Sequence, residues 1–337
     1  MKKPGVAIIG LGMAAGHHAR SLIDLADQVD MIAAYSPTEA RRLAFAAQYG
    51  LPVTDTVSDI YHDERVNAVL ILTPPNTHLE LVEQAAKAGK HILLEKPLDV
   101  SLERARAIVS VARDAGVLLS VVLQNRFRSS FRTAQDLLRS GQLGTILEAT
   151  ASVRNWRPQS YYDEPGRGTL ARDGGGVLLT QAIHTIDLLL ALAGKPLDVT
   201  ASVRTSPIHR MEKEDLVNAT FHFENGAMGT LNATTCAYPG YPDRIELICT
   251  NGTAILTGDS LDATLQGGRR ITAGQNLASG SGSDPMAFGH ELHRLLIEEF
   301  VKAITSGLPI TVDGEDALRA QAFISSIIDA GRRQPET

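Results

Sequence analysis

The stretch that decides the fold of the first part of the chain is Val6-Ala7-Ile8-Ile9-Gly10-Leu11-Gly12-Met13-Ala14-Ala15. Its opening apolar run predicts a buried parallel strand that ends at the first glycine. The G-x-G-x-x-A pattern then leads into helical spacing over residues 15–25. Strand, glycine turn and helix in this order are the context in which the pattern binds a dinucleotide, because free amides at the helix N-terminus hold the phosphates.

Each small residue of this turn has a separate predicted task. Gly10 permits the tight turn, Gly12 lets a pyrophosphate approach the backbone, and Ala15 lets the helix pack closely. The alternative is a plain tight turn without a ligand. We predict an NAD(P)-type cofactor here, contacted by the residues of the turn: Gly10, Gly12, Met13 and Ala14.

Strand and helix patterns continue to alternate through the first part of the chain. The expected strands are 6–9, 31–35, 68–72, 91–94 and 117–123. The expected helices between them are 15–25, 38–49, 77–88 and 101–115. Such alternation predicts an α/β domain, a parallel doubly wound Rossmann sheet covered on both faces, over residues 1–122.

The second part, residues 123–337, has a different pattern. Helices are expected at about 128–139, 174–192, 288–305 and 314–331, and a mobile loop at 274–285. Alternating segments predict strands at 147–153, 199–204, 216–223, 227–235, 244–249 and 253–256. Short Gly and Asn turns between consecutive strands favour an open, mostly antiparallel sheet. We expect this α/β domain to bind the substrate and to form oligomers.

Composition excludes several classes of protein. The chain has 337 residues, 44% of them hydrophobic and 21% charged, which fits about two globular domains rather than a disordered or coiled-coil chain. A net charge of −6 argues against broad nucleic-acid binding. We see no apolar run near the roughly 18 residues of a membrane helix and no signal-peptide pattern, so we expect a cytoplasmic protein. Cys236 and Cys249 are expected to be buried thiols, and no metal site is predicted.

The end of the second expected strand bears on the choice between NAD and NADP. A ribose-binding carboxylate is expected about 20 residues past the glycines, where this chain has Ser36. A serine would not repel a 2′-phosphate, and Arg41 and Arg42 follow within a helical turn. These arginines are either phosphate ligands or solvated surface charges. We favour NADP slightly over NAD.

Two further loops follow the carboxyl ends of expected parallel strands: Thr73-Pro74-Pro75-Asn76-Thr77-His78 and Glu95-Lys96-Pro97. Ligands of open α/β sheets bind along this edge. We therefore predict that these loops contribute further cofactor contacts, from Thr73, Pro74, Asn76, His78, Glu95 and Lys96.

In the second part, Thr180, His184 and Asp187 fall at i, i+4 and i+7, which places them on one face of the expected helix. Spacing alone favours an ordinary core histidine over a catalytic one. Metal binding by His184 has even less support than catalysis, because no second His or Cys lies at the spacing of a metal ligand.

Together these motifs, with Gly174-Gly175-Gly176 and the segment 226–234, resemble the glucose-fructose oxidoreductase / inositol dehydrogenase (Gfo/Idh/MocA) family along nearly the whole chain. The resemblance implies NAD(P)-dependent hydride transfer at a hydroxyl-bearing carbon of a sugar or cyclitol. It implies Lys96 and His184 as catalytic residues and a homodimer or homotetramer. Other reaction types with retained cofactor (imine, dihydrodiol or eliminase chemistry) and a non-catalytic NAD(P)-binding regulator remain alternatives.

The chemistry implied by this resemblance needs a base for the hydroxyl proton. His184 has a suitable ordinary pKa, and Lys96 can stabilise the developing negative charge or take the proton itself; the sequence does not decide between them. Thr180 occupies a position where relatives commonly have Asp, which weakens a proton relay through it but leaves a hydrogen-bonding hydroxyl. Expected substrate contacts are Lys96, Arg126, Arg157, Tyr162, Thr180 and His184.

Overall fold

The computed structural model describes residues 3–275 and 280–333. By contacts the chain divides into two compact units, the first made of Met1–Gln124 and Gly289–Leu318, the second of Asn125–Phe288 and Arg319–Thr337. The chain therefore passes between the units three times, the last time inside helix α11 (Gly314–Arg332). The sequence analysis placed one boundary at 122/123, whereas here residues 289–318 return to the first unit.

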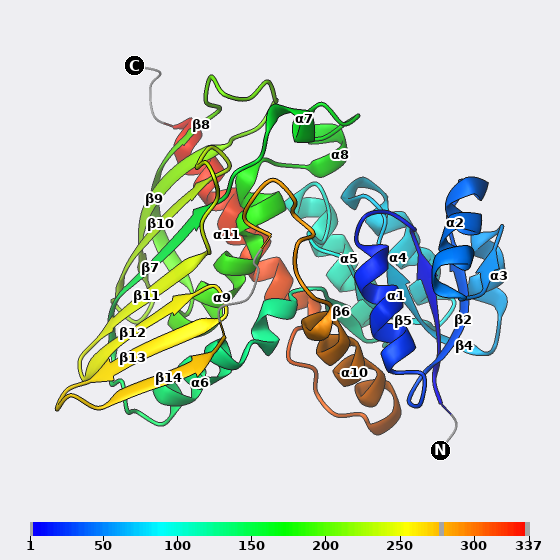
Figure 1. The fold of residues 1–337 in the computed structure, drawn as a ribbon, viewed down its shortest axis with the longest axis horizontal. Helices are drawn as coiled ribbons and strands as arrows, with labels where there is room; N and C mark the ends of the chain where they lie inside the picture. Colours follow the sequence, from blue (N-terminus) through cyan, green and yellow to red (C-terminus); the bar gives the residue numbers. More distant parts are fainter. Residues whose placement is uncertain (1–2, 276–279, 334–337) are drawn as a thin grey trace. The chain divides into compact units, whose positions relative to one another are not determined.

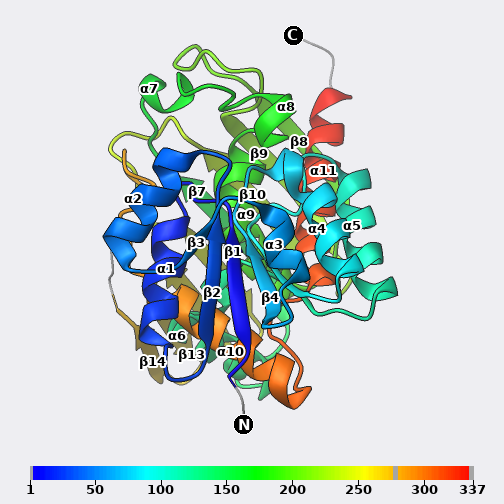
Figure 2. The ribbon, with the colours of Figure 1, turned by 90° about the vertical axis from the view of Figure 1, so that its right-hand side faces the viewer.

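The first unit holds a parallel sheet with the strand order β3-β2-β1-β4-β5-β6. Its strands are β1 (Gly5–Ile9), β2 (Asp30–Tyr35), β3 (Val53–Thr54), β4 (Val66–Ile71), β5 (His91–Leu94) and β6 (Leu119–Val121). Figure 2 shows α1 (Ala15–Asp24) and α2 (Glu39–Tyr49) on one side of the sheet, and α4 (His78–Lys87) and α5 (Leu102–Asp114) on the other. The predicted Rossmann architecture is confirmed, and its order reverses between β1 and β4, where such folds bind ligands.

Two short elements of this unit were not predicted, and the helix predicted at about 288–305 was assigned to the second part of the chain. Strand β3 and helix α3 (Val57–His62) lie between α2 and β4. Helix α10 (Glu291–Ser306) packs on α1. There the rings of His17 and His293 stack with centroids 5.2 Å apart, and Ser21 Oγ donates to the carbonyl of His290 at 3.3 Å.

The second unit holds a sheet with the strand order β14-β13-β12-β11-β7-β10-β9-β8. Its strands are β7 (Ile146–Arg154), β8 (Pro196–Arg204), β9 (Leu216–Phe223), β10 (Met228–Thr234), β11 (Arg244–Cys249), β12 (Gly252–Thr257), β13 (Ser260–Leu265) and β14 (Arg270–Gly274). Among the described strands, β7 and β10 pair in parallel and the other neighbours pair antiparallel. The mostly antiparallel sheet is confirmed; β13 and β14 were not predicted.

One face of this sheet is covered by helices, as Figure 1 shows for α6 (Ser129–Arg139), α9 (Ile183–Ala193) and the end of α11. Strict alternation of buried and exposed residues along β9 explains this, because its even-numbered residues face outward and its odd-numbered residues face the core. Phe221 of β9 meets Phe323 of α11 with ring centroids 4.8 Å apart.

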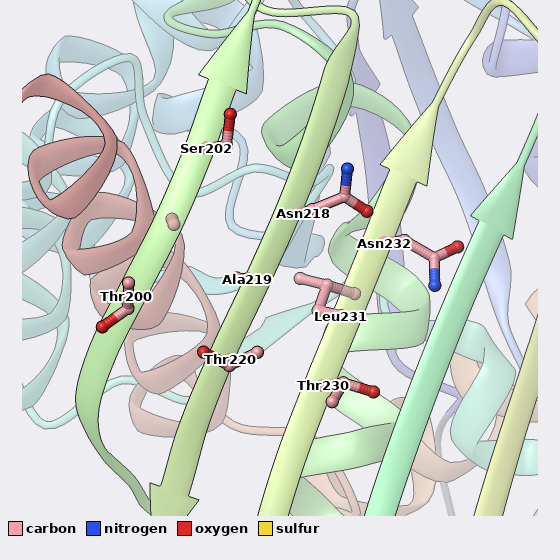
Figure 3. A pocket seen from close by; sticks show the side chains of 9 residues that line it. Thr200, Ser202, Asn218, Ala219, Thr220, Thr230, Leu231 and Asn232 are labelled. Carbon is pink, nitrogen blue, oxygen red and sulfur yellow. The ribbon is translucent and has the colours of Figure 1, made fainter. Parts of the chain in front are cut away.

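The opposite face of β8, β9 and β10 carries a shallow hollow (Figure 3). Small polar side chains line most of it: Thr200, Ser202, Asn218, Thr220, Thr230 and Asn232. Towards one end of the same face, Met228 and Ile248 lie in register on either side of Glu148 and are 55% and 43% exposed. This face therefore combines small hydroxyl and amide groups with exposed apolar side chains.

One segment corrects an expectation from composition. Residues Leu170–Ala193 are long and apolar enough to cross a membrane, although the sequence analysis saw no such run. In the structure the segment is broken into α8 (Leu170–Asp173), a π-helical turn η3 (Leu178–Ala182) and α9, and 67% of its apolar window is buried. Burial inside the second unit accounts for its hydrophobicity, as in core helices of globular proteins.

Candidate functional site

The turn after β1 fits a dinucleotide. Gly10 has φ +107°, and a Cβ there would lie 2.8 Å from the backbone between Leu72 and Thr73, so the fold itself requires glycine. A Cβ on Gly12 would meet nothing within 4 Å. Helix α1 begins at Ala15 with no side-chain cap and no acidic residue in its first turn. The N-terminus of α1 and the space over Gly12 suit a pyrophosphate, because the positive end of the helix dipole favours a negative charge.

The loop after β2, residues 36–38, carries no carboxylate, and α2 then begins with Glu39, followed by the cations Arg41 and Arg42. Arg42 donates to the carbonyl of Ser36 at 2.7 Å, which holds its guanidinium at the end of the strand. Ser36 itself is buried, and its Oγ accepts from the amide of Thr38 at 3.4 Å. Arg41 is exposed. Of the two arginines, Arg42 is therefore the one that the backbone already holds in place.

The loops after β4 and β5 are joined by His78. This side chain is fully buried; its Nδ1 faces the carbonyls of Pro97 and Leu98 at 3.1 and 3.0 Å, and its Nε2 faces that of Thr73 at 2.9 Å. Burial lowers the pKa of His78, and the carbonyls oppose that shift. Since the imidazole is enclosed, we infer that it positions the loops that carry Thr73 and Lys96.

Other members of the predicted cofactor set lie around these loops. Pro74 and Asn76 are exposed, and Lys96 is half-buried, directly before a cis peptide bond to Pro97. Glu95 Oε2 lies 3.6 Å from Nε2 of His18, whose side chain is fully buried. The structure thus gathers the predicted residues of the first unit at the carboxyl ends of β1, β2, β4 and β5.

In the second unit the helix with His184 offers one narrow accessible row. Between residues 175 and 189, Thr180, Gln181 and His184 are half-exposed and the other residues are buried. The π-helical turn η3 precedes α9 and adds a residue to the turn, a distortion frequent at functional sites. Thr180 and His184 are both accessible, whereas Asp187, which was predicted to lie on the same face, is 1% exposed.

Asp187 has a different partner. Its carboxylate accepts two hydrogen bonds from Arg126, from Nε at 2.8 Å and from NH2 at 2.6 Å. The two side chains are 1% and 10% exposed. Arg126, predicted to contact a sugar, is thus held in a buried bidentate ion pair that joins the segment after β6 to α9.

Arg157 and Tyr162, two more expected sugar contacts, are also enclosed. The Arg157 guanidinium donates to backbone carbonyls of Trp156 and residues 280–282, and to Gln181 Oε1 at 2.6 Å. The Tyr162 hydroxyl bonds Thr235 Oγ1 at 2.8 Å, and burial raises the pKa of Tyr162. Their contacts indicate that both hold the surrounding loops.

The structure shows polar contacts along residues 175–189 that sequence reasoning missed. Gln181 donates to the Tyr161 hydroxyl at 3.2 Å, and Arg167 donates to the same oxygen at 2.8 Å. Glu214 Oε1 accepts from the amides of Gly176 and Leu178, both at 3.2 Å, and so caps the start of the helix. The sequence contains no spacing signal for Glu214, because it lies 36 residues beyond Leu178.

Comparisons with known proteins agree with this geometry. Residues 5–123 match the family model for "Oxidoreductase family, NAD-binding Rossmann fold", and residues 131–255 match that for "GFO/IDH/MocA C-terminal domain". The chain is 28% identical over 326 residues to inositol 2-dehydrogenase of Rhizobium meliloti, covering 95% of this chain and 94% of that protein. It is 27% identical over 336 residues to myo-inositol 2-dehydrogenase of Thermotoga maritima, with 94% and 92% covered.

Among solved structures, the WlbA dehydrogenase from Bordetella pertussis in complex with NADH and UDP-GlcNAcA superimposes with a TM-score of 0.84 at 25% identity, and both chains are covered fully. The Rossmann sheet, the open glycine turn and these matches lead to one conclusion. The chain belongs to the Gfo/Idh/MocA family and is an NAD(P)-binding oxidoreductase.

Proposed function

We propose that this oxidoreductase transfers hydride between a nicotinamide cofactor and a hydroxyl-bearing carbon of a sugar, sugar derivative or cyclitol. The observation that carries the proposal is the accessible row of Thr180, Gln181 and His184 among the otherwise buried residues 175–189. A hydroxyl, an amide and an imidazole can each bond to a polyol. Dehydrogenases of inositols among the relatives support the same substrate class.

In this proposal the bound nicotinamide supplies the hydride chemistry, and the chain supplies binding and proton transfer. His184 accepts the proton of the reacting hydroxyl, and the ammonium of Lys96 stabilises the negative charge that develops on its oxygen. Thr180 Oγ1 already donates to the carbonyl of Gly176 at 2.7 Å. The lone pairs of Thr180 Oγ1 can therefore accept a hydrogen bond from a second substrate hydroxyl. The proton of the reacting hydroxyl is removed by His184 or Lys96.

Kinetics of matched variants test these roles. We expect Lys96→Met and His184→Asn to lower kcat about 100- to 10,000-fold on myo-inositol, scyllo-inositol or the active member of an aldose panel. Their dissociation constants for NAD(P)H should stay near the wild-type value. Lys87→Met, which changes an exposed lysine in the last turn of α4, is the control and should keep full turnover. Full turnover by either catalytic variant would remove that residue from the mechanism.

For the cofactor we propose NADP ahead of NAD, on the basis of Ser36 and the neighbouring cations. Titrations with NADPH and NADH, followed by nicotinamide fluorescence, should show tighter binding of NADPH. Arg42→Gln should weaken NADPH binding and leave NADH binding unchanged, because only NADPH carries the 2′-phosphate. An equal loss of affinity for NADPH and NADH in Arg42→Gln would contradict this assignment. A wild-type preference for NADH would contradict it as well.

We also propose that the outward face of the second unit's sheet pairs with another copy of the chain. Exposed Met228 and Ile248 beside rows of small polar residues support a self-association surface. Light scattering coupled to gel filtration should give a dimer or tetramer. Met228→Lys should dissociate it, whereas Leu43→Lys, an exposed apolar site in α2, should not. A wild-type monomer would overturn the proposal.

A further inference from the structure

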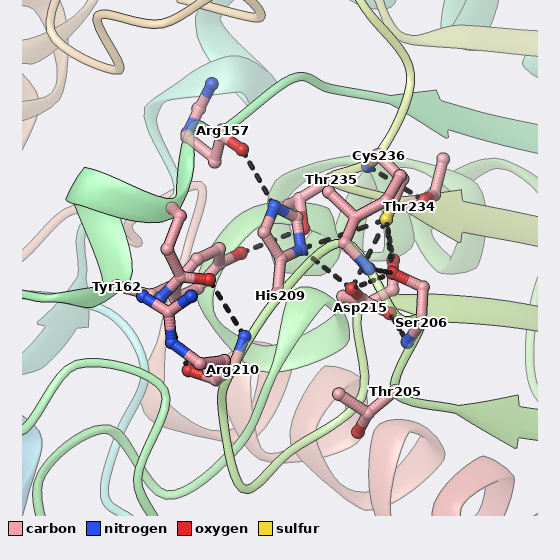
Figure 4. Close-up of polar contacts among 12 residues, drawn as sticks. Arg157, Tyr162, Thr205, Ser206, His209, Arg210, Asp215, Thr234, Thr235 and Cys236 are labelled. Carbon is pink, nitrogen blue, oxygen red and sulfur yellow. Dashed lines mark hydrogen bonds and ion pairs between the residues drawn. The ribbon is translucent and has the colours of Figure 1, made fainter.

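A histidine, an aspartate and a cysteine, none of them on the helix with the accessible row, meet in the second unit (Figure 4). His209 and Asp215 come from the segment between β8 and β9, and Cys236 follows β10. His209 Nδ1 lies 2.7 Å from Asp215 Oδ2, Cys236 Sγ lies 3.3 Å from the same oxygen, and Sγ to Nδ1 is 3.8 Å. The side chains of His209 and Asp215 are fully buried, and Cys236 is half-exposed.

The other ring nitrogen of His209 has a fixed partner. Its Nε2 lies 2.8 Å from the backbone carbonyl of Arg157, which can only accept. A proton on Nε2 is therefore required, and Nδ1 points at the carboxylate and the sulfur. Metal-bound histidines have this arrangement, with one nitrogen on the ion and the other donating to a carbonyl or a carboxylate.

We propose that His209, Asp215 and Cys236 bind a Zn²⁺ ion whose fourth ligand is water. Tetrahedral zinc, with bonds of about 2.3 Å to sulfur and about 2.0 Å to nitrogen and oxygen, separates sulfur from the lighter ligands by about 3.5 Å. The observed distances from Cys236 Sγ are 3.3 Å to Asp215 Oδ2 and 3.8 Å to His209 Nδ1, on either side of that value. Nδ1 and Oδ2 must move apart from 2.7 Å to about 3.3 Å. Water reaching half-exposed Cys236 completes four ligands.

The charges of the cluster also suit a divalent ion. Without metal, the contacts require an imidazolium, a carboxylate and a neutral thiol, which sum to zero. Zn²⁺ replaces two protons, one from Nδ1 and one from the thiol, and the sum stays zero. No uncompensated charge is therefore created among buried groups, which is the usual obstacle to placing an ion in a protein interior. The thiolate selects zinc over magnesium or calcium.

Such an ion would join three segments of the second unit. Asp215 also accepts from the amide and hydroxyl of Ser206, both at 2.6 Å, so it already anchors the turn after β8. His209 holds the carbonyl of Arg157, whose guanidinium bonds Gln181 beside the helix row. Zinc at this point would stabilise the support of the substrate loop without touching the substrate.

The test uses tag-free full-length protein, expressed with added zinc and dialysed. Elemental analysis should find one zinc per chain, and Co²⁺ added to the metal-free protein should give a thiolate-to-metal charge-transfer band. Cys236→Ser keeps a hydroxyl that can donate to Asp215 but removes the thiolate. Cys249→Ser is the matched control, because Cys249 is a buried free cysteine at the end of β11 and is not part of the cluster.

We expect Cys236→Ser to bind neither ion at stoichiometric level, while Cys249→Ser binds both like the wild type. A chelator should lower the Tm of the wild type and leave that of Cys236→Ser unchanged, which separates metal loss from a folding defect. Zinc-free wild-type protein that gives no cobalt band would overturn the proposal. Equal metal binding by Cys236→Ser would overturn it as well.

Discussion

The buried pair of Arg126 and Asp187 gives the sharpest prediction for stability. Asp187→Asn keeps the shape of the side chain but removes the negative charge that pairs with the Arg126 guanidinium, which is only 10% exposed. Breaking such a pair by removing one partner costs about 3–5 kcal/mol, since the remaining charge stays buried. In a domain of 150–250 residues each kcal/mol shifts Tm by about 2–4 °C, so we expect a loss of about 6–20 °C.

The sole tryptophan makes the assay specific to the second unit. Trp156 lies in that unit and is half-buried, so its fluorescence follows the unfolding of the unit in which the pair lies. The double variant Arg126→Met with Asp187→Leu removes both charges and should recover most of the lost Tm, because well-packed apolar replacements are often neutral. A shift below about 2 °C for Asp187→Asn, or additive losses in the double variant, would refute the reasoning.

Three further predictions rest on single positions. Gly12→Ala should keep the Tm of the cofactor-free protein, because its Cβ meets nothing, but weaken NAD(P)H binding at least about tenfold by fluorescence titration; unchanged affinity would exclude close pyrophosphate approach. Gly176→Ala should destabilise by roughly 1–3 kcal/mol in thermal unfolding, because its Cβ would lie 1.9 Å from the carbonyl oxygen of Glu214; a wild-type Tm would contradict this. Burial, with Arg20 adding to it, lowers the pKa of His17 to about 4 in the folded protein. Between pH 6.5 and 4 the imidazole is therefore protonated in the unfolded chain but not in the folded chain. Stability followed by circular dichroism should therefore fall as pH drops through this window, and His17→Asn should flatten that slope; an equal slope in the variant would refute the assignment.

Much of the fold could be predicted because it follows from local patterns. Strand β5 was expected at its observed residues, and Ser101 caps α5 as its sequence position suggested, with Oγ accepting from the amide of Arg104 at 3.2 Å. Strand β3 has two residues, too few to show any period. The parallel pairing of β7 with β10 joins segments about 80 residues apart, and adjacency in the sequence favours antiparallel hairpins instead.

The candidate site shows the same limit. The glycine turn could be assigned from sequence because its chemistry lies in consecutive residues. Glu214, Tyr161 beside Gln181, and Arg126 beside Asp187 come from distant segments, and only folding brings them to the helix. The helical period that placed Thr180 and His184 on one face also assumed an undistorted helix, whereas η3 inserts a π-helical turn there.

The return of residues 289–318 to the first unit has a consequence for synthesis on the ribosome. When residue 124 has been made, the surface of α1 around His17 and Ser21 still lacks α10, which arrives only when the chain is nearly finished. At a translation rate of about 5–20 residues per second, that surface of α1 stays uncovered for roughly 10–40 s before α10 has been synthesised. A fragment ending at residue 124 would retain this gap permanently, so a separately expressed cofactor domain should carry residues 289–318 joined by a linker.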